Sequence, residues 1–218
     1  VNKIPFFVSI SRNLKFGTIE PLAGQTQAKL FQAFQGIARV YQTGGFRVRH
    51  VLMDNQFKCM EGDLKGMQVL FTGVQFNRTA RDEHVGEIER YNRTVKERMR
   101  CVYTTLPFTH VPNRLVIELA KRVVFWLKAF PAKYGISDTL SPRTIVTGQT
   151  VNHDRHCGHD FCDYVQTHEQ HDNSMAPRTI GALALRPTGN EQGSYYYLSL
   201  DTGKVINRLH ATSMPMPK

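Results

Sequence analysis

The sequence predicts a mixed α/β domain followed by a small all-β domain. In the first part of the chain, short apolar or alternating runs that predict strands stand beside longer runs with apolar residues every three or four positions, which predict helices. Toward the C-terminus only short strand-like runs occur, and turn residues separate them. Helices and strands that share a domain bury their apolar faces against one another, so we expect helices packed on a sheet.

The first domain has a simple order of predicted elements. Strands are predicted over residues 5–11, 16–22, 47–53 and 67–74. Helices are predicted over residues 26–41, 84–101 and 113–134. Thr26 is a suitable N-cap for the first helix, and Gly44-Gly45 ends it. The third predicted strand delivers an acid, Asp54, at its C-terminal end.

A change of composition after Gly135 divides the chain. We interpret residues 1–136 as the first domain, residues 137–159, which are rich in turn-forming and polar residues, as a linker, and residues 160–212 as the second domain. Strands in the second domain are predicted over residues 161–167, 179–185, 193–199 and 205–210. Short strands at this spacing predict a small barrel or sandwich.

Net charge limits the class of partner. The 218 residues include 28 Lys and Arg against 18 Asp and Glu, a formal charge of +10, and the sequence pI is near 9.6. Such a charge favours a polyanion, either nucleic acid or an anionic membrane surface. No apolar run reaches about 18 residues, so no membrane-spanning helix is expected. With four cysteines and no signal peptide, a reducing compartment is expected, and the start at Val1 is interpreted as that of a piece of a longer protein.

The predicted helix at 84–101 carries two stripes of different chemistry. The apolar stripe recurs at spacings of three, four and seven and contains Val85, Ile88, Val95, Met99 and Val102, with Asn92 as its polar member. The second row follows the same spacing and contains Glu89, Arg93, Lys96 and Arg100. This row is either a solvated face stabilised by Glu–Arg pairs or a surface that binds an anion.

Asp54 and Glu89 are candidate metal ligands. Glu89 follows Asp54 by 35 positions, and the two acids stand at the end of a predicted strand and near the start of a predicted helix. Carboxylates that meet can hold Mg²⁺ together with substrate phosphates, and two such ions about 3.5–4 Å apart can stabilise an in-line phosphoryl displacement. Two acids chosen from a sequence are more often ordinary surface residues, so the pair alone defines no site.

The residues around this pair resemble known motifs. Residues 85–94 (VGEIERYNRT) resemble the N-G-x-x-E-R-x-N-R-T signature of retroviral-type integrases, most closely that of the copia class of LTR retrotransposons. Residues 53–57 (MDNQF) resemble the D-N-G-x-E-F motif that follows a strand in the same family, and the interval between the acids matches the family's D-x35-E spacing within a residue. Further similarity, to the strand pair after the first catalytic Asp, to the segment after the core and to the β-barrel that follows in copia polyproteins, covers residues 2–18, 113–142 and 160–212.

This resemblance implies a ribonuclease-H-like fold, two Mg²⁺ or Mn²⁺ ions, and strand transfer in which a 3′-hydroxyl of element DNA attacks a target phosphodiester. Asp54 would be the second catalytic acid and Glu89 the third. The side chains expected on or beside DNA are Arg90, Asn92, Arg93, Lys96 and Arg100. The implied partners are element-end DNA, target DNA and further copies of the chain, without a membrane. The implied location is the nucleus, with a cytoplasmic particle before integration.

The sequence also departs from the family pattern. The family's first catalytic Asp belongs on a strand that would precede Val1. Gln56 stands where the family has Gly, and Val85 where it has Asn. Lys58 or Cys59 occupies the place where an acid is common. We therefore expect the chain alone to lack a full carboxylate set and to be inactive. The alternatives are a non-catalytic nucleic-acid-binding remnant of the same fold and an unrelated basic α/β scaffold.

Three further features each have two interpretations. Glu87 competes with Glu89 for the role of third acid, because residues two positions apart on a helix face different ways and only one of them can point at the metals. The motif favours Glu89. A cluster of histidines and cysteines either binds zinc or belongs to a polar loop, and the polar loop is favoured. Its members are His153, His156, Cys157, His159, Cys162, His168 and His171. The tyrosines at 195–197 either stack on bases or form a half-buried strand, which is favoured.

Overall fold

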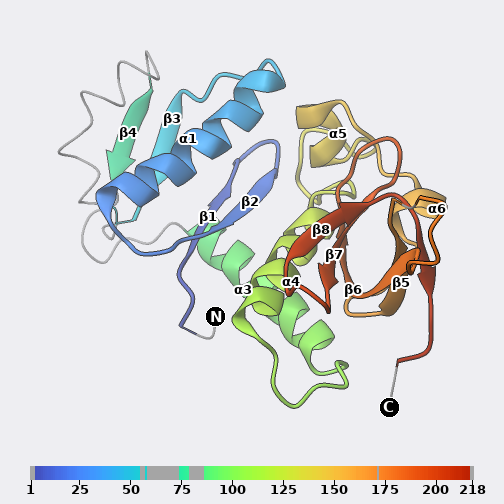
Figure 1. Cartoon of the computed structure of the whole chain (residues 1–218). Helices are drawn as coiled ribbons and strands as arrows, with labels where there is room; N and C mark the ends of the chain where they lie inside the picture. The colour runs from blue at the N-terminus through green and yellow to red at the C-terminus, as the bar shows by residue number, and fades with distance from the viewer. Residues whose placement is uncertain (1–2, 55–56, 58–73, 79–85, 171, 217–218) are drawn as a thin grey trace. The chain divides into compact units, whose positions relative to one another are not determined.

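The computed structural model describes residues 3–54, 57, 74–78, 86–170 and 172–216 (Figure 1). The chain divides into two compact units. Unit 1 consists of residues 1–97 and 127–148, and unit 2 of residues 98–126 and 149–218. The division falls within α3 (Gly86–Tyr103), whose first turns belong to unit 1 and whose last turns belong to unit 2.

Two separate pairs of strands form the sheets of unit 1. β1 (Phe6–Ile10) and β2 (Gly17–Pro21) are antiparallel, with Val8 opposite Ile19. β3 (His50–Met53) and β4 (Gln75–Arg78) are parallel, with Val51 opposite Phe76. α1 (Gln27–Thr43) follows the first pair in the chain and precedes the second.

These elements test the prediction for the first part of the chain. The strands predicted over residues 5–11, 16–22 and 47–53 and the helix predicted over residues 26–41 are confirmed. The strand predicted over 67–74 lies outside the described residues except for Val74, and β4 begins one residue later.

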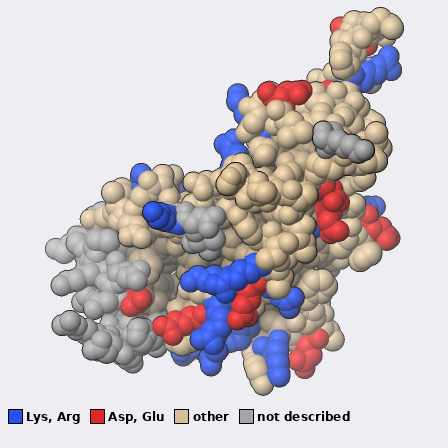
Figure 2. All heavy atoms as spheres, turned by 90° about the horizontal axis from the view of Figure 1, so that it is seen from below, with Lys and Arg blue, Asp and Glu red and all other residues tan. Residues whose placement is uncertain are grey.

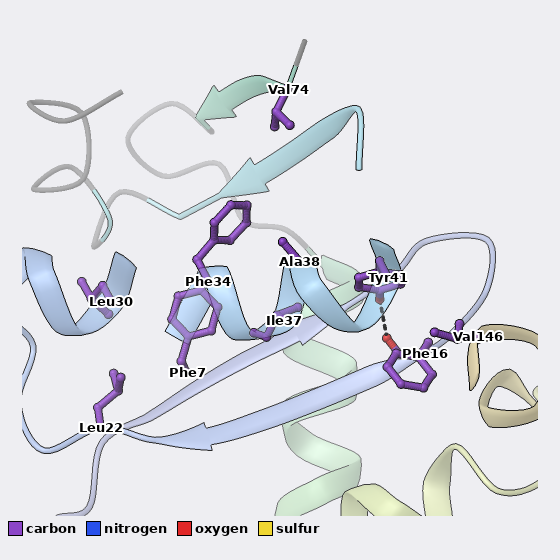
Figure 3. Close-up of a cluster of buried hydrophobic side chains, with 10 residues drawn as sticks. All are labelled: Phe7, Phe16, Leu22, Leu30, Phe34, Ile37, Ala38, Tyr41, Val74 and Val146. Carbon is purple, nitrogen blue, oxygen red and sulfur yellow. Dashed lines mark hydrogen bonds between the residues drawn. The ribbon is translucent and has the colours of Figure 1, made fainter. Parts of the chain in front are cut away.

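One helix covers both strand pairs. The apolar face of α1 consists of Leu30, Phe34, Ile37, Ala38 and Tyr41, all buried. The ring of Tyr41 lies 5.6 Å from that of Phe16, the residue before β2 (Figure 3), and the ring of Phe34 lies 5.8 Å from that of Phe76 in β4. The two strand pairs therefore share one core. Within the described residues, each of the four strands is hydrogen-bonded to a neighbour on one side only.

The segment interpreted as a linker contains two short helices, α5 (Pro142–Thr147) and α6 (His153–His156). α5 begins after Ser141, whose hydroxyl accepts a hydrogen bond from the Thr144 N–H at 3.1 Å, and ends at Gly148, whose φ is 70°. It packs closely on the end of α1, because a Cβ added to Gly44 would lie 2.0 Å from the carbonyl oxygen of Val146. Residues 142–147 are therefore part of the core of unit 1.

α4 (Asn113–Leu127) is shorter than predicted. Its buried apolar side chains are Leu115, Val116, Leu119, Ala120, Val123, Val124 and Phe125. The prediction that this helix continues to residue 134 is wrong. Pro131 has no N–H to donate to the carbonyl of Leu127, and its ring would collide with that carbonyl, so the helix ends there. Neither α4 nor another helix in the described ranges is long and apolar enough to cross a membrane.

Five antiparallel strands form the sheet of unit 2, in the spatial order β8-β7-β6-β5-β9. They are β5 (Tyr164–His168), β6 (Thr179–Pro187), β7 (Tyr195–Ser199), β8 (Val205–Arg208) and β9 (Ala211–Ser213). Only Leu209 and His210 connect the two outer strands, β8 and β9. A connection this short spans roughly 11 Å, whereas the outer strands of a flat sheet would lie roughly 19 Å apart, so the sheet curls toward a barrel. The predicted mixed α/β class with a small all-β domain is confirmed.

Charged side chains join α4 to this sheet. Arg186 of β6 donates to the carboxylate of Glu118 at 2.9 Å. Arg122 donates to the carbonyl oxygens of Leu185 at 2.9 Å and His159 at 3.0 Å. Glu118 is 5% exposed, and a carboxylate buried to this extent is stable only when it is paired. These bonds fix one side of α4 on the sheet.

His156 ties α6 to the loop before β7. Its imidazole is 1% exposed. Nδ1 lies 3.0 Å from the backbone nitrogen and 2.9 Å from the carbonyl oxygen of Asn152, and Nε2 lies 2.8 Å from the carbonyl oxygen of Asn190. Both ring nitrogens are therefore hydrogen-bonded inside unit 2.

His156→Ala is expected to lower the free energy of unfolding of unit 2 by about 2–4 kcal/mol, because it leaves a cavity and unpaired buried backbone groups. His153→Ala is the matched control, since that side chain is 88% exposed and its loss should change stability by less than about 0.5 kcal/mol. Urea unfolding followed by circular dichroism measures both variants. Equal stability of the two would contradict a structural role for His156.

Candidate nucleic-acid and metal site

α3 has the two-sided character that its sequence predicts. Val95 and Met99 are each 4% exposed, whereas Ile88, Tyr91 and Asn92 are half-buried. The exposed side chains of the charged row and its neighbour are Glu89, Arg90, Arg93, Lys96 and Arg100. Among the residues that the structure describes, Arg93, Lys96 and Arg100 make no ion pair, so their charges are available to a phosphate. The half-buried Asn92 lies at the edge of this surface rather than on it.

The first turn of α3 is held in place by Glu87, the second candidate for the third acid. The carboxylate of Glu87 forms an ion pair with Lys15, in the turn between β1 and β2, and its second oxygen lies 3.6 Å from Nε of Arg12. A carboxylate in the first turn also interacts favourably with the positive end of the helix dipole. Glu87 is therefore neutralised by cations of the hairpin.

The second turn of α3 is held by a close approach to β2. A Cβ added to Gly17 would lie 2.0 Å from the hydroxyl oxygen of Tyr91, so only glycine leaves room for this ring. The Tyr91 hydroxyl is buried and has no hydrogen-bond partner within the described residues. Burial raises the pKa of Tyr91, so the hydroxyl stays protonated. Its role at this position is therefore packing.

Asp54 stands directly after β3, as the sequence predicts, and is half-buried. Its carbonyl oxygen accepts a hydrogen bond from the Phe57 N–H at 3.0 Å. That the carboxylates of Asp54 and Glu89 meet stays a prediction. Both offer the oxygen ligands that Mg²⁺ prefers. In the described part of the chain, no group of three or more His, Cys, Asp or Glu side chains could hold a metal ion. The motif positions Gln56, Lys58, Cys59 and Val85 lie outside the described residues.

The histidines and cysteines near α6 have separate structural environments. His156 is buried as described above. Cys162 is 3% exposed, and burial raises the pKa of its thiol to about 12. His159 Nδ1 lies 3.0 Å from the hydroxyl of Ser213, and Cys157 is exposed. Burial gives His156 and Cys162 structural roles in unit 2, and His171 lies outside the described residues.

The tyrosines of β7 form a half-buried strand, as predicted. Tyr195 and Tyr197 are 3% and 1% exposed, with ring centroids 6.0 Å apart in the core of the sheet. Tyr196 points to the other face of the strand, where the guanidinium of Arg186 lies 4.2 Å from its ring centroid. The two buried rings are not available for stacking on bases.

Sequence analysis missed the hairpin residues that hold α3, namely Arg12, Lys15 and Gly17. One local signal was available, because a glycine inside a predicted strand often marks a close approach of another segment. Which side chain would approach Gly17 could not be read from the sequence, since Tyr91 lies far along the chain.

Comparisons with known proteins give likenesses in structure only. No family model and no curated protein matches the sequence. The chain is similar to the catalytic core domain of BIV integrase, with 15% identity, 67% of this chain and 88% of that chain covered, and a TM-score of 0.47. It is also similar to the simian T-cell lymphotropic virus intasome, with 11% identity, 99% of this chain and 81% of that chain covered, and a TM-score of 0.44. Likenesses at these scores carry no conclusion about activity.

Gly17→Ala is expected to destabilise unit 1 by about 1–3 kcal/mol, because the added methyl group collides with the Tyr91 ring. The matched control is Gly36→Ala, at an exposed position of α1 where an added Cβ meets nothing within 4 Å. There alanine should stabilise the helix by about 0.5–1 kcal/mol. Thermal unfolding compares the two variants, and a Gly17→Ala protein as stable as wild type would contradict the close approach.

Proposed function

We propose that this chain is a fragment of a retroviral-type integrase of the copia-like class, which binds DNA and serves divalent-metal-dependent strand transfer. The proposal rests on α3, where one side packs into unit 1 and the exposed side presents Glu89 beside Arg93 and Lys96. This is the arrangement that the E-R-x-N-R-T resemblance implies, with an acid and cations on one accessible surface. Asp54, at the end of a parallel strand, supports the same assignment.

The exposed cations of α3 suit a ligand that is recognised by its backbone. Arg93, Lys96 and Arg100 recur at spacings of three and four, so their side chains form one row along the helix. Lys and Arg side chains in such a row neutralise successive phosphates and give affinity that depends on salt and tolerates different base sequences. Acidic side chains lie among the basic ones on the face drawn in Figure 2, so the surface has mixed charge. A specific row of cations is therefore a better candidate than net charge alone.

Asp54 and Glu89 are the residues that would hold the divalent ions. A pair of Mg²⁺ or Mn²⁺ ions, when bound, supplies Lewis acid stabilisation of the attacking and leaving oxygens of a phosphodiester. Glu87 is the other candidate for the third acid, and its carboxylate pairs with Lys15 and Arg12 of the hairpin. Arg90, exposed and next to Glu89 in the chain, would contact a phosphate near the ions.

The alternative function is a non-catalytic nucleic-acid-binding remnant of the same fold. DNA binding is common to both proposals, and only the first requires the full set of acids. In either case the cations of α3 serve the same purpose. The integrase proposal also carries the expectations that the complete protein acts as a multimer and works in the nucleus.

Arg93→Ala and Lys96→Ala are each expected to weaken DNA binding for all sequences and to reduce the slope of log K against log salt by about 1, because each removes one phosphate contact. Arg98→Ala is the matched control, since Arg98 is an exposed cation on the same helix and lies roughly opposite Lys96 around its axis. Fluorescence anisotropy with duplex DNA at several salt concentrations measures the slopes. Equal effects from all three variants would point to net charge and contradict a defined row.

The 218-residue chain is expected to catalyse no strand transfer in Mg²⁺ or Mn²⁺, because only two of the three acids are proposed to be present. Circular dichroism of the same sample verifies that it is folded. Strand transfer that disappears in Asp54→Asn and Glu89→Gln would contradict the incomplete site while supporting the integrase class. A signal that survives both substitutions would overturn the assignment of these acids.

A further inference from the structure

The turn between β1 and β2 forms a well-defined platform under the start of α3. Lys15 has a left-handed φ of 55°, and its N–H donates to the carbonyl of Ser11 at 2.9 Å. The Ser11 hydroxyl accepts a hydrogen bond from the Phe16 N–H at 3.0 Å. These bonds fix the backbone of the turn on both sides of the Lys15 ammonium, which therefore meets Glu87 from a defined position.

The contacts of α3 with this platform lie on one side of the helix. Each residue of an α-helix advances by roughly 100°, so Glu87 and Tyr91 are roughly 40° apart around the axis. Glu89 is roughly 160° from both of them, and Arg93 and Lys96 lie beside Glu89. The side chains that touch the hairpin are therefore opposite the side chains proposed to meet metal and DNA.

We infer that Glu87, Lys15 and Tyr91 are positioning residues, which fix the rotation of α3 about its axis and thereby present Glu89, Arg93 and Lys96 on the opposite face. The functional consequence rests on the proposed function. An ion pair at the first turn and a ring seated on Gly17 at the second turn are two separate points of attachment. Two points on one side of a helix prevent it from rotating, whereas one point would act as a pivot.

Lys15 is the principal partner of Glu87. The side chains of Lys15 and Glu87 are 23% and 20% exposed, whereas that of Arg12 is 72% exposed. Exposed ion pairs are screened by water and salt and contribute little, so Arg12 adds less than Lys15. The Lys15–Glu87 pair can therefore be tested by exchanging its charges, with Arg12 left in place.

Hydrogen–deuterium exchange of the whole chain tests the attachment without any ligand. Lys15→Glu and Glu87→Lys should each raise the exchange of amides 88–92 by about three- to fivefold, because each places like charges together. The double variant Lys15→Glu/Glu87→Lys should restore slow exchange. Tyr91→Phe, which removes only an unpaired hydroxyl and keeps the ring, should exchange like wild type. If the double variant loses the protection of both single variants combined, the inference is overturned.

Titration of Mn²⁺ in the presence of duplex DNA, followed by electron paramagnetic resonance, tests the functional consequence. Glu87→Lys should weaken Mn²⁺ binding by about tenfold, as loss of a supporting partner does, and the charge-exchanged double variant should recover it. Lysine at position 87 cannot serve as a metal ligand, so recovery of Mn²⁺ affinity in the double variant is expected only if Glu87 acts through its pair with Lys15. Failure of the double variant to recover Mn²⁺ affinity would overturn the positioning role. If the Glu89→Gln variant binds Mn²⁺ as tightly as wild type does, the proposed metal site is wrong. The hydrogen–deuterium exchange measurements would still decide how α3 is attached.

Discussion

α3 packs through one side and leaves the other side to solvent, and this arrangement organises the charged surface of unit 1. On α3 the packed side is defined twice, by the pairing of Glu87 with Lys15 and by the seating of Tyr91 on Gly17. Once these contacts exist, the direction of Glu89 follows from helical geometry alone. The direction of the exposed row of Glu89, Arg93 and Lys96 is therefore determined by contacts made on the opposite side of the helix.

The platform for α3 depends in turn on α1. Neither strand pair of unit 1 would be stable alone, because two strands bury too little apolar surface in water. The buried face of α1 contacts both pairs, with Tyr41 on the Phe16 ring and Phe34 on the Phe76 ring. The Tyr41 hydroxyl also donates to the Phe16 carbonyl at 3.1 Å, which fixes the start of β2 (Figure 3). Apolar packing of α1 thus orders the β1–β2 hairpin, on which α3 packs.

Local patterns predicted most of the described elements because their causes are local. Alternation predicted the strands near β1 and β2, and apolar spacing predicted α1 and the buried Val95 and Met99 of α3. The prediction failed for the end of α4, where Pro131 was treated as tolerated although it acts on Leu127, one turn earlier. Within the segment interpreted as a linker, polar and turn-forming residues conceal the packing of Val146 on α1.

The sequence by itself determined the class of the fold, the excess of positive charge and the two-sided character of α3, because periodicity and composition are properties of neighbouring residues. It could not show which acid of α3 pairs with the hairpin. Lys15 lies 72 positions before Glu87, and no local pattern reports a pairing over that distance. Only the tertiary structure brings the hairpin to α3. There Glu87 pairs with Lys15, and Tyr91 packs on Gly17, so that Glu89 faces away from the hairpin.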